Sequence, residues 1–161
     1  MGRSSKKTAL GAGIRLDSFL PYRLNRLAGE VSRRLSAVYS GRFGLDIPEW
    51  RVLATLSSRG MATAQEIVAS TRTHKSTISR AVATLTERGL VERTGSPSDG
   101  RELVLQLTDS GLRLMRELMP LVLEAEREIL GQLSVEERAQ LLQAIAAVEA
   151  ALGLGDEEDT A

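Results

Sequence analysis

Apolar residues recur with helical spacing along the first third of the chain. Their intervals of three and four residues place them on one side of a long helix: Leu16, Leu20, Leu24, Leu27, Val31, Leu35 and Val38. We expect Asp17 or Ser18 to cap this helix, Pro21 to lie in its first turn, and Gly41 and Gly44 to end it. A helix of about 35–40 Å is long for a compact monomer, so it is either a subunit-contact helix or an ordinary core helix.

Two shorter capped helices are predicted after a helix that Pro48 opens and Gly60 ends. Thr63 and Glu66 have the spacing of a capping box, and the helix they start stops near Ser70. Thr73 is the expected cap of the next helix, residues 74–88. Two helices across so tight a turn form a helix-turn-helix.

The helix over residues 74–88 has one apolar and one polar side. Ile78, Ala81, Val82 and Leu85 share the apolar side. The polar side carries cationic and hydroxyl side chains: Lys75, Ser76, Ser79 and Arg80. A helix that is anchored on one side and polar on the other suits the major groove of DNA.

A hairpin and two further helices complete the predicted fold. Leucines at 103, 105 and 107 alternate with Glu102, Val104 and Gln106, which indicates a half-buried strand, and residues 90–94 supply its partner. Thr108 caps a helix from Asp109 to Leu130 that Pro120 should bend, and Ser134 with Glu137 opens another. The last helix repeats apolar residues at helical spacing: Leu141, Ile145, Val148 and Leu152.

These elements give a mainly α fold with a small β-hairpin wing, a winged helix-turn-helix. The expected organisation is a flexible arm (1–15), an N-terminal dimerisation helix (16–47), a DNA-binding domain (48–108), C-terminal dimerisation helices (109–153) and an acidic disordered tail (154–161).

Residue inventory argues against an enzyme. The chain has no cysteine and one histidine, His74, which removes thiol nucleophiles, thiolate metal sites and a histidine-rich metal centre. No nucleophile and base pair can be assembled, so we expect no catalysis, no cofactor and no metal. No apolar run is long enough for a membrane span, and a cytoplasmic location is expected.

The formal net charge is zero, but the charges are unevenly distributed. Residues 1–47 hold nine basic and three acidic side chains, whereas residues 109–161 hold four basic and twelve acidic ones. Because the acidic end repels phosphate, a DNA surface has to lie elsewhere, on locally clustered Lys and Arg.

Three motifs in their joint spacing resemble the MarR family of bacterial regulators. They are Leu85-Thr-Glu-Arg-Gly-Leu-Val-Glu-Arg93, Ser96-Pro-Ser-Asp-Gly-Arg101 and Leu107-Thr-Asp-Ser-Gly111. The resemblance covers about residues 16–152. It implies a homodimer with interlocked terminal helices, recognition helices in major grooves, wings in minor grooves, and a near-palindromic operator with half-sites about 34 Å apart. The residues expected to join the two subunits are apolar positions of the first and last helices: Leu16, Leu20, Leu141, Leu142, Ile145 and Val148.

The resemblance also implies contacts with double-stranded DNA. Bases and phosphates would meet Ser76, Thr77, Ser79 and Arg80, with Arg80 suited to bidentate guanine contact and Lys75 to phosphate. Arg101 would enter the minor groove, and Asp99 would hold the wing by pairing with a basic residue; otherwise the two are a solvated surface pair. Open alternatives remain at four positions: Thr63 and Gln65 meet phosphate or only cap a helix, Arg93 touches phosphate or does not, and His74 is a phosphate contact, a pH-sensing or ligand group, or inert.

Family members commonly release DNA when a small anionic or aromatic compound binds, so a small-molecule effector is expected, for example an aromatic acid or its coenzyme A thioester. The expected cleft is lined by Phe19, Tyr22, Arg23, Arg26, Trp50, Arg51, Met115 and Met119. The alternative is that the aromatic residues are core and the arginines a solvated face. For the whole chain, a ligand-responsive dimeric repressor is favoured, and the alternative is a winged-helix protein-interaction module that no longer binds DNA.

Overall fold

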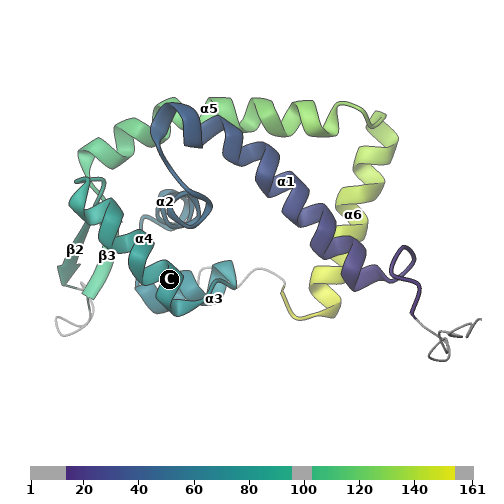
Figure 1. Cartoon of the computed structure of the whole chain (residues 1–161), viewed down its shortest axis with the longest axis horizontal. Helices are drawn as coiled ribbons and strands as arrows, with labels where there is room; N and C mark the ends of the chain where they lie inside the picture. Colours follow the sequence, from purple (N-terminus) through teal and green to yellow (C-terminus); the bar gives the residue numbers. More distant parts are fainter. Residues whose placement is uncertain (1–13, 96–102, 155–161) are drawn as a thin grey trace, which may run out of the picture.

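The computed structural model describes residues 14–95 and 103–154 of the 161-residue chain. The described part folds into the following elements in chain order: α1 (Leu20–Phe43), α2 (Ile47–Arg59), β1 (Met61–Ala62), α3 (Ala64–Thr71), α4 (Lys75–Glu87), β2 (Val91–Gly95), β3 (Leu103–Leu107), α5 (Asp109–Leu130) and α6 (Val135–Ala151). The expected mainly helical fold is confirmed. In Figure 1, α2 to α4 and the strands form one lobe, while α1, most of α5 and α6 extend away from it.

The start of α1 differs from the sequence prediction. The helix begins at Leu20 with Phe19 at the N-cap position, and neither Asp17 nor Ser18 caps it. The Ser18 hydroxyl instead donates to the Arg15 carbonyl in a preceding turn that also contains Leu16. Pro21 does lie in the first turn, as expected. The helix continues through Gly41 and ends at Gly44, whose φ of 60° is the left-handed conformation that glycine adopts readily.

Capping boxes fix the starts of α2, α3 and α6. Those of α3 (Thr63 with Glu66) and α6 (Ser134 with Glu137) confirm the spacing argument. The capping box of α2, formed by Asp46 and Glu49, was not predicted. The helix was expected to begin at Pro48, whereas it begins one residue earlier, at Ile47, with Asp46 as its N-cap.

The expected cap of α4 is wrong. His74 occupies the N-cap position and makes no side-chain capping bond. The Thr73 hydroxyl donates to the Thr71 carbonyl and accepts from an Arg51 N–H at 2.9 Å. Thr73 therefore serves the turn between α3 and α4 rather than the helix start.

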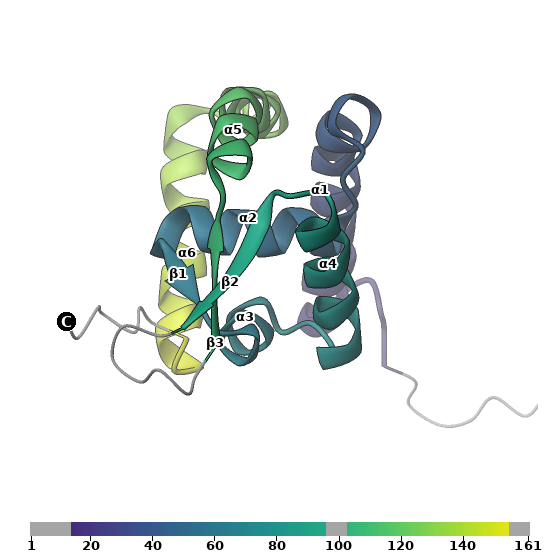
Figure 2. The same cartoon turned by 90° about the vertical axis from the view of Figure 1, so that its left-hand side faces the viewer.

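The wing hairpin belongs to a three-stranded antiparallel sheet with the order β1-β3-β2. Figure 2 shows β3 between the other two strands, with α4 beside β2. The short strand β1 was not predicted. The alternation expected for β3 is only partly right, because Leu103 is 61% exposed while Val104 is buried with Leu105 and Leu107.

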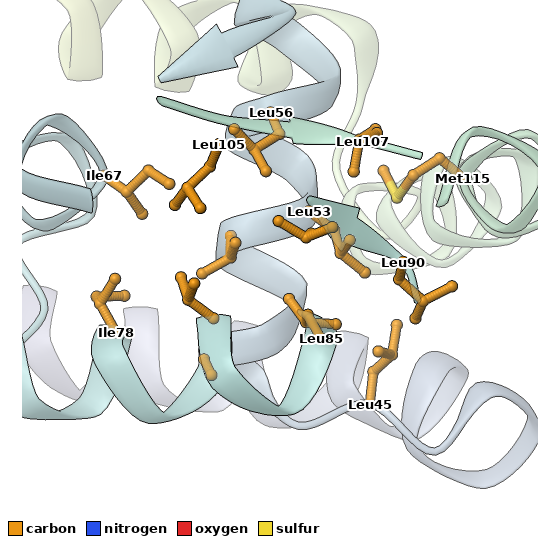
Figure 3. Packing of buried hydrophobic residues seen from close by; sticks show 14 of the residues in the cluster. Leu45, Leu53, Leu56, Ile67, Ile78, Leu85, Leu90, Leu105, Leu107 and Met115 are labelled. Atoms are coloured by element: carbon orange, nitrogen blue, oxygen red, sulfur yellow. The ribbon is translucent and has the colours of Figure 1, made fainter. Parts of the chain in front are cut away.

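The core lies where α2, α4 and the sheet meet, and α1 and α5 extend it. Its fully buried members include Leu53 and Leu56 of α2, Ile67 of α3, and Ile78 and Leu85 of α4. Figure 3 shows these side chains converging from the surrounding elements, with Leu105, Leu107 and Met115 closing the cluster. This packing fixes α4 by one face and leaves its other face available.

The terminal helices are less buried. Thr108 caps α5 by accepting from the Gly111 N–H, as expected, and the helix runs on through Pro120. No residue of α6 is buried. Among residues 14–95 and 103–154, no helix is both long and apolar enough to cross a bilayer.

Candidate nucleic-acid interface

The two faces of α4 have opposite chemistry. Ile78, Ala81, Val82 and Leu85 are at most 5% exposed, which anchors the helix in the core. The opposite face carries exposed Lys75, Ser76, Ser79 and Arg80 beside half-buried Thr77. The structure thus brings all five residues predicted for α4 to one side of one helix.

The cations on this face are not neutralised by neighbours. Within the described residues, no carboxylate lies within salt-bridge distance of Lys75 or Arg80. The first turn of α4 contains no acidic residue and places Lys75 where the helix dipole is positive. A lysine there costs a few tenths of a kcal/mol rather than stabilising the helix. These cations therefore add little to the stability of the fold, and their position suits an anionic partner.

Side chains around the turn hold the start of α4. Arg51 of α2 donates to the Thr73 hydroxyl and so ties the helix to the turn. His74 Nδ1 lies 3.0 Å from the Ser76 hydroxyl, and both side chains are exposed. His74 therefore borders the cationic face without contributing to the core.

A capping box occupies the N-terminus of α3. The Thr63 hydroxyl accepts from the Glu66 N–H at 3.1 Å, and the Glu66 carboxylate accepts from the Thr63 N–H at 2.6 Å. This carboxylate places negative charge at the helix end where phosphate would approach. Gln65 is exposed beside it. The geometry therefore supports the capping role of Thr63 directly and leaves a phosphate contact to Gln65.

One predicted wing residue is within the described structure. Arg93 is exposed on β2, where it pairs in register with Leu105. The preceding residue, Glu92, points to the opposite face of the sheet and accepts a hydrogen bond from Gln106 across the strands at 2.7 Å. Asp99 and Arg101 lie outside the described residues.

The opposite end of α4 contains a residue that sequence reasoning missed. Arg88, the C-cap residue of α4, donates to the carbonyls of Phe43 and Gly44 at the end of α1. The available signal was an arginine directly before Gly89 at a helix end, where cations can bind free carbonyls. The partner carbonyls are more than forty positions away and could not be read from the spacing.

The residues predicted to bind an effector fall into two groups in the single chain. Trp50 stacks on Tyr39 with ring centroids 5.4 Å apart, next to Arg51 on the same helix. Tyr22, Arg23 and Arg26 are exposed near the start of α1. Since 17 residues of helix separate Tyr22 from Tyr39, about 26 Å of α1 lies between the groups.

The remaining residues predicted for the effector cleft do not close this gap. Phe19 is 41% exposed beside Tyr22, whereas Met115 is buried and Met119 packs against the core. A groove of about 480 Å³ does lie between α1 and α5, lined by other residues: Arg33, Arg34, Ala37, Val38, Ala125, Glu128 and Ile129. The two arginines there already bind Glu30, whose pKa they lower to about 2 through hydrogen bonds.

The residues predicted to join two subunits are largely exposed in one chain. Leu16 and Leu20 are more than half exposed, as is Leu142, while Ile145 and Val148 are each about two-fifths exposed. Leu141 is half-buried. Unpaired apolar side chains on both terminal helices form a surface that an isolated chain would leave in water.

Comparisons with known proteins agree with this geometry. Residues 43–102 match the model of the MarR family. The chain is 32% identical over 129 residues to the transcriptional regulator PecS of Dickeya dadantii, covering 78% of this chain and 77% of that protein. It is 31% identical to the transcriptional repressor IacR of Pseudomonas putida, covering 69% of this chain and 66% of that protein. The structure of the PcaV transcriptional regulator from Streptomyces coelicolor, solved with its natural ligand, superposes with a TM-score of 0.70 at 26% identity, covering 88% of this chain and 99% of that one.

Proposed function

The chain belongs to the MarR family, and from that premise we propose that it is a dimeric, ligand-responsive transcriptional repressor that binds a near-palindromic operator. The observation that carries the proposal is α4, whose apolar face is buried while its exposed face presents Lys75 and Arg80, neither of which has a carboxylate within 4 Å among the residues that the structure describes. The family is one of transcriptional regulators, so the proposal includes no catalytic role.

In this proposal α4 enters the major groove. There Arg80 donates two hydrogen bonds to a guanine edge, because a planar guanidinium matches the two acceptors of that base. Lys75 binds phosphate as a flexible point charge. Ser76, Thr77 and Ser79 supply short hydroxyls between these cations. Arg93 contacts phosphate, and Arg101, which lies outside the described residues, enters the adjacent minor groove.

Two copies are needed to place two such helices on one face of DNA. We propose that the exposed apolar residues of α1 and α6 are buried between subunits. Support comes from α6, which buries no residue in a single chain. With recognition helices about 34 Å apart, the half-sites lie one helical turn apart.

For the effector we propose a small aromatic or anionic compound, such as an aromatic acid or its coenzyme A thioester. The similarity to PcaV, whose structure was solved with its natural ligand, supports a small-molecule site. In one chain, Tyr22, Arg23 and Arg26 are distant from Trp50 and Arg51. A pocket that uses both groups therefore has to be completed by the second subunit.

The test begins with the purified full-length chain. Its mass by sedimentation should be that of a dimer, and selection from a random duplex library should enrich an inverted repeat. A panel of hydroxylated benzoic acids, nicotinic acids and their coenzyme A esters is then screened for release of the selected duplex. A chain that binds no duplex at low salt would instead favour a protein-interaction module. Binding without release by any compound would remove the ligand-responsive part only.

A further inference from the structure

The C-terminal end of α4 is joined to the start of α5. The Thr108 hydroxyl donates to the Gly89 carbonyl at 2.7 Å, and the Thr108 N–H donates to the Leu90 carbonyl at 3.1 Å. The same hydroxyl caps α5 by accepting from the Gly111 N–H. The Thr108 side chain therefore links the segment that directly follows α4, the proposed reading helix, to the first turn of α5.

Arg88 joins the same end of α4 to α1. Its Nη2 donates to the Phe43 carbonyl at 2.8 Å, and its Nη1 donates to the Gly44 carbonyl at 3.0 Å. Carbonyls at a helix C-terminus have no partner within the helix and carry partial negative charge. A guanidinium supplied by α4 thus caps α1, although the two segments are 44 and 45 positions apart in the sequence.

A buried carboxylate adds α2 to this junction. Glu49 holds the start of α2 by accepting from the Asp46 N–H, and its Oε2 lies 3.8 Å from Arg88 Nη1. The Glu49 side chain is 9% exposed and that of Arg88 33%. A carboxylate with so little exposure to water needs compensating donors and charge. Among the described residues, Arg88 is the cation that lies within 4 Å of it. One side chain therefore contacts the end of α1, the start of α2 and the end of α4.

The placement of Arg88 separates it from the face that reads DNA. Arg88 follows Lys75 by 13 residues, so about 20 Å of helix lies between them. If the attachment at Arg88 loosens, α4 can tilt. Over about 20 Å, a tilt of about 3° displaces the Lys75 end by about 1 Å. A displacement of this size is comparable with the positional error that a preorganised binding site can accept.

From this geometry we infer that Arg88 is a positioning residue: it couples the placement of α1 to the orientation of the reading helix and does not itself contact DNA. The inference rests on the proposed function. It assigns the coupling to a junction of α1, α2 and α4 that lies outside the expected effector cleft.

The experiment compares Arg88→Gln and Arg88→Lys with Arg42→Gln. Arg42 is the matched control, because it also lies at the end of α1 and its side chain is 66% exposed; it lies 4.0 Å from Glu117 and over the Phe43 ring, 5.4 Å from the ring centroid, and donates to neither the Phe43 nor the Gly44 carbonyl in the described structure. Dissociation constants are measured by fluorescence anisotropy for the selected operator and for a scrambled duplex of equal length. Measurements cover several salt concentrations at a temperature where circular dichroism shows every variant folded.

We expect Arg88→Gln to weaken operator binding about tenfold, with binding to the scrambled duplex and the salt dependence unchanged. Arg88→Lys should be intermediate, because an ammonium keeps the charge but lacks the planar fork that reaches both carbonyls. Arg42→Gln should match the wild type.

Other outcomes overturn the inference. Equal losses on both duplexes, with a salt slope smaller by about two per dimer, would make Arg88 a phosphate contact. A lower melting temperature with unchanged operator affinity would make it a structural cap only. If Arg88→Gln does not fold, Arg88→Lys decides by the two duplexes alone: a loss confined to the operator supports the inference, and an equal loss on both duplexes overturns it. A wild type that binds no duplex would refute the proposed function itself, which separates that failure from a failure at Arg88.

Discussion

Substitution of Gly111 tests how closely the first turn of α5 packs against Leu90, which lies between α4 and β2. Gly111 lies in the first turn of α5, where an added Cβ would overlap the Leu90 carbonyl oxygen and lie 3.2 Å from its carbon. Leu90 has little room to move, because its N–H donates to the Leu85 carbonyl and its carbonyl accepts from the Thr108 N–H. Gly111→Ala therefore has to displace backbone rather than the end of a flexible side chain.

Two effects of opposite sign determine the result. Alanine is favoured over glycine inside a helix by about 1 kcal/mol. Overpacking against fixed backbone costs about 1–3 kcal/mol, and weakening the Thr108 to Leu90 hydrogen bond costs about 1 kcal/mol more. The clash wins, so we expect a net loss of about 1–3 kcal/mol. For a chain of this length, that lowers the melting temperature by about 3–9 °C.

The assay is thermal unfolding at one protein concentration, because the stability of the proposed dimer would depend on concentration. Gly41→Ala is the control: Gly41 lies within α1, and nothing is within 4 Å of its added Cβ. This variant should gain about 0.5–1 kcal/mol from helix propensity alone. If Gly111→Ala stabilised the protein as Gly41→Ala does, the close approach of α5 to Leu90 would be refuted.

Further predictions concern DNA contact, assembly and pH. Arg80→Ala should weaken operator binding by about 1–3 kcal/mol and relax the base preference in competition assays. Lys75→Ala should weaken binding to all sequences alike and reduce the salt dependence of binding. A change of base preference in Lys75→Ala would contradict the phosphate role of Lys75. Ile145→Lys should give monomers in sedimentation, and an intact dimer would exclude Ile145 from the interface. The Glu30 pKa is lowered to about 2 by Arg33 and Arg34, so its ion pairs stabilise the folded state above the ordinary glutamate pKa and are lost as pH falls toward 2. The Glu30 carboxyl should titrate near 2 by NMR, and a midpoint near 4.3 would contradict the pairing.

The sequence predicts those parts of the fold that depend on local chemistry. The capping boxes at Thr63 and Ser134 and the buried face of α4 were found because their partners lie within three or four residues. The cap at Thr73 was predicted wrongly because Arg51, 22 positions away, binds that hydroxyl. Strand β1 was missed because a strand of this length is defined by pairing with β3 across the fold.

The candidate site divides in the same way. Residues of α4 share one face because helical periodicity puts them there, so the sequence was sufficient to group them. The expected effector residues come from distant segments, and periodicity gives no information on whether they meet. The role of Arg88 could not be predicted from the sequence either, since it depends on the carbonyls of Phe43 and Gly44, which are distant in the chain.

The net charge of zero constrains how such a chain can bind DNA. In the proposed dimer, the exposed face of α4 offers each subunit few cations, chiefly Lys75 and Arg80, while residues 109–161 carry twelve acidic side chains against four basic ones. One subunit alone should therefore bind duplex weakly. Joining two subunits makes the second contact intramolecular and raises affinity by about 10²–10⁴ without any new kind of contact. The monomeric Ile145→Lys variant should then lose operator binding by a comparable factor although its α4 is unchanged, and full-strength binding by a monomer would refute the argument that neutrality makes dimerisation obligatory.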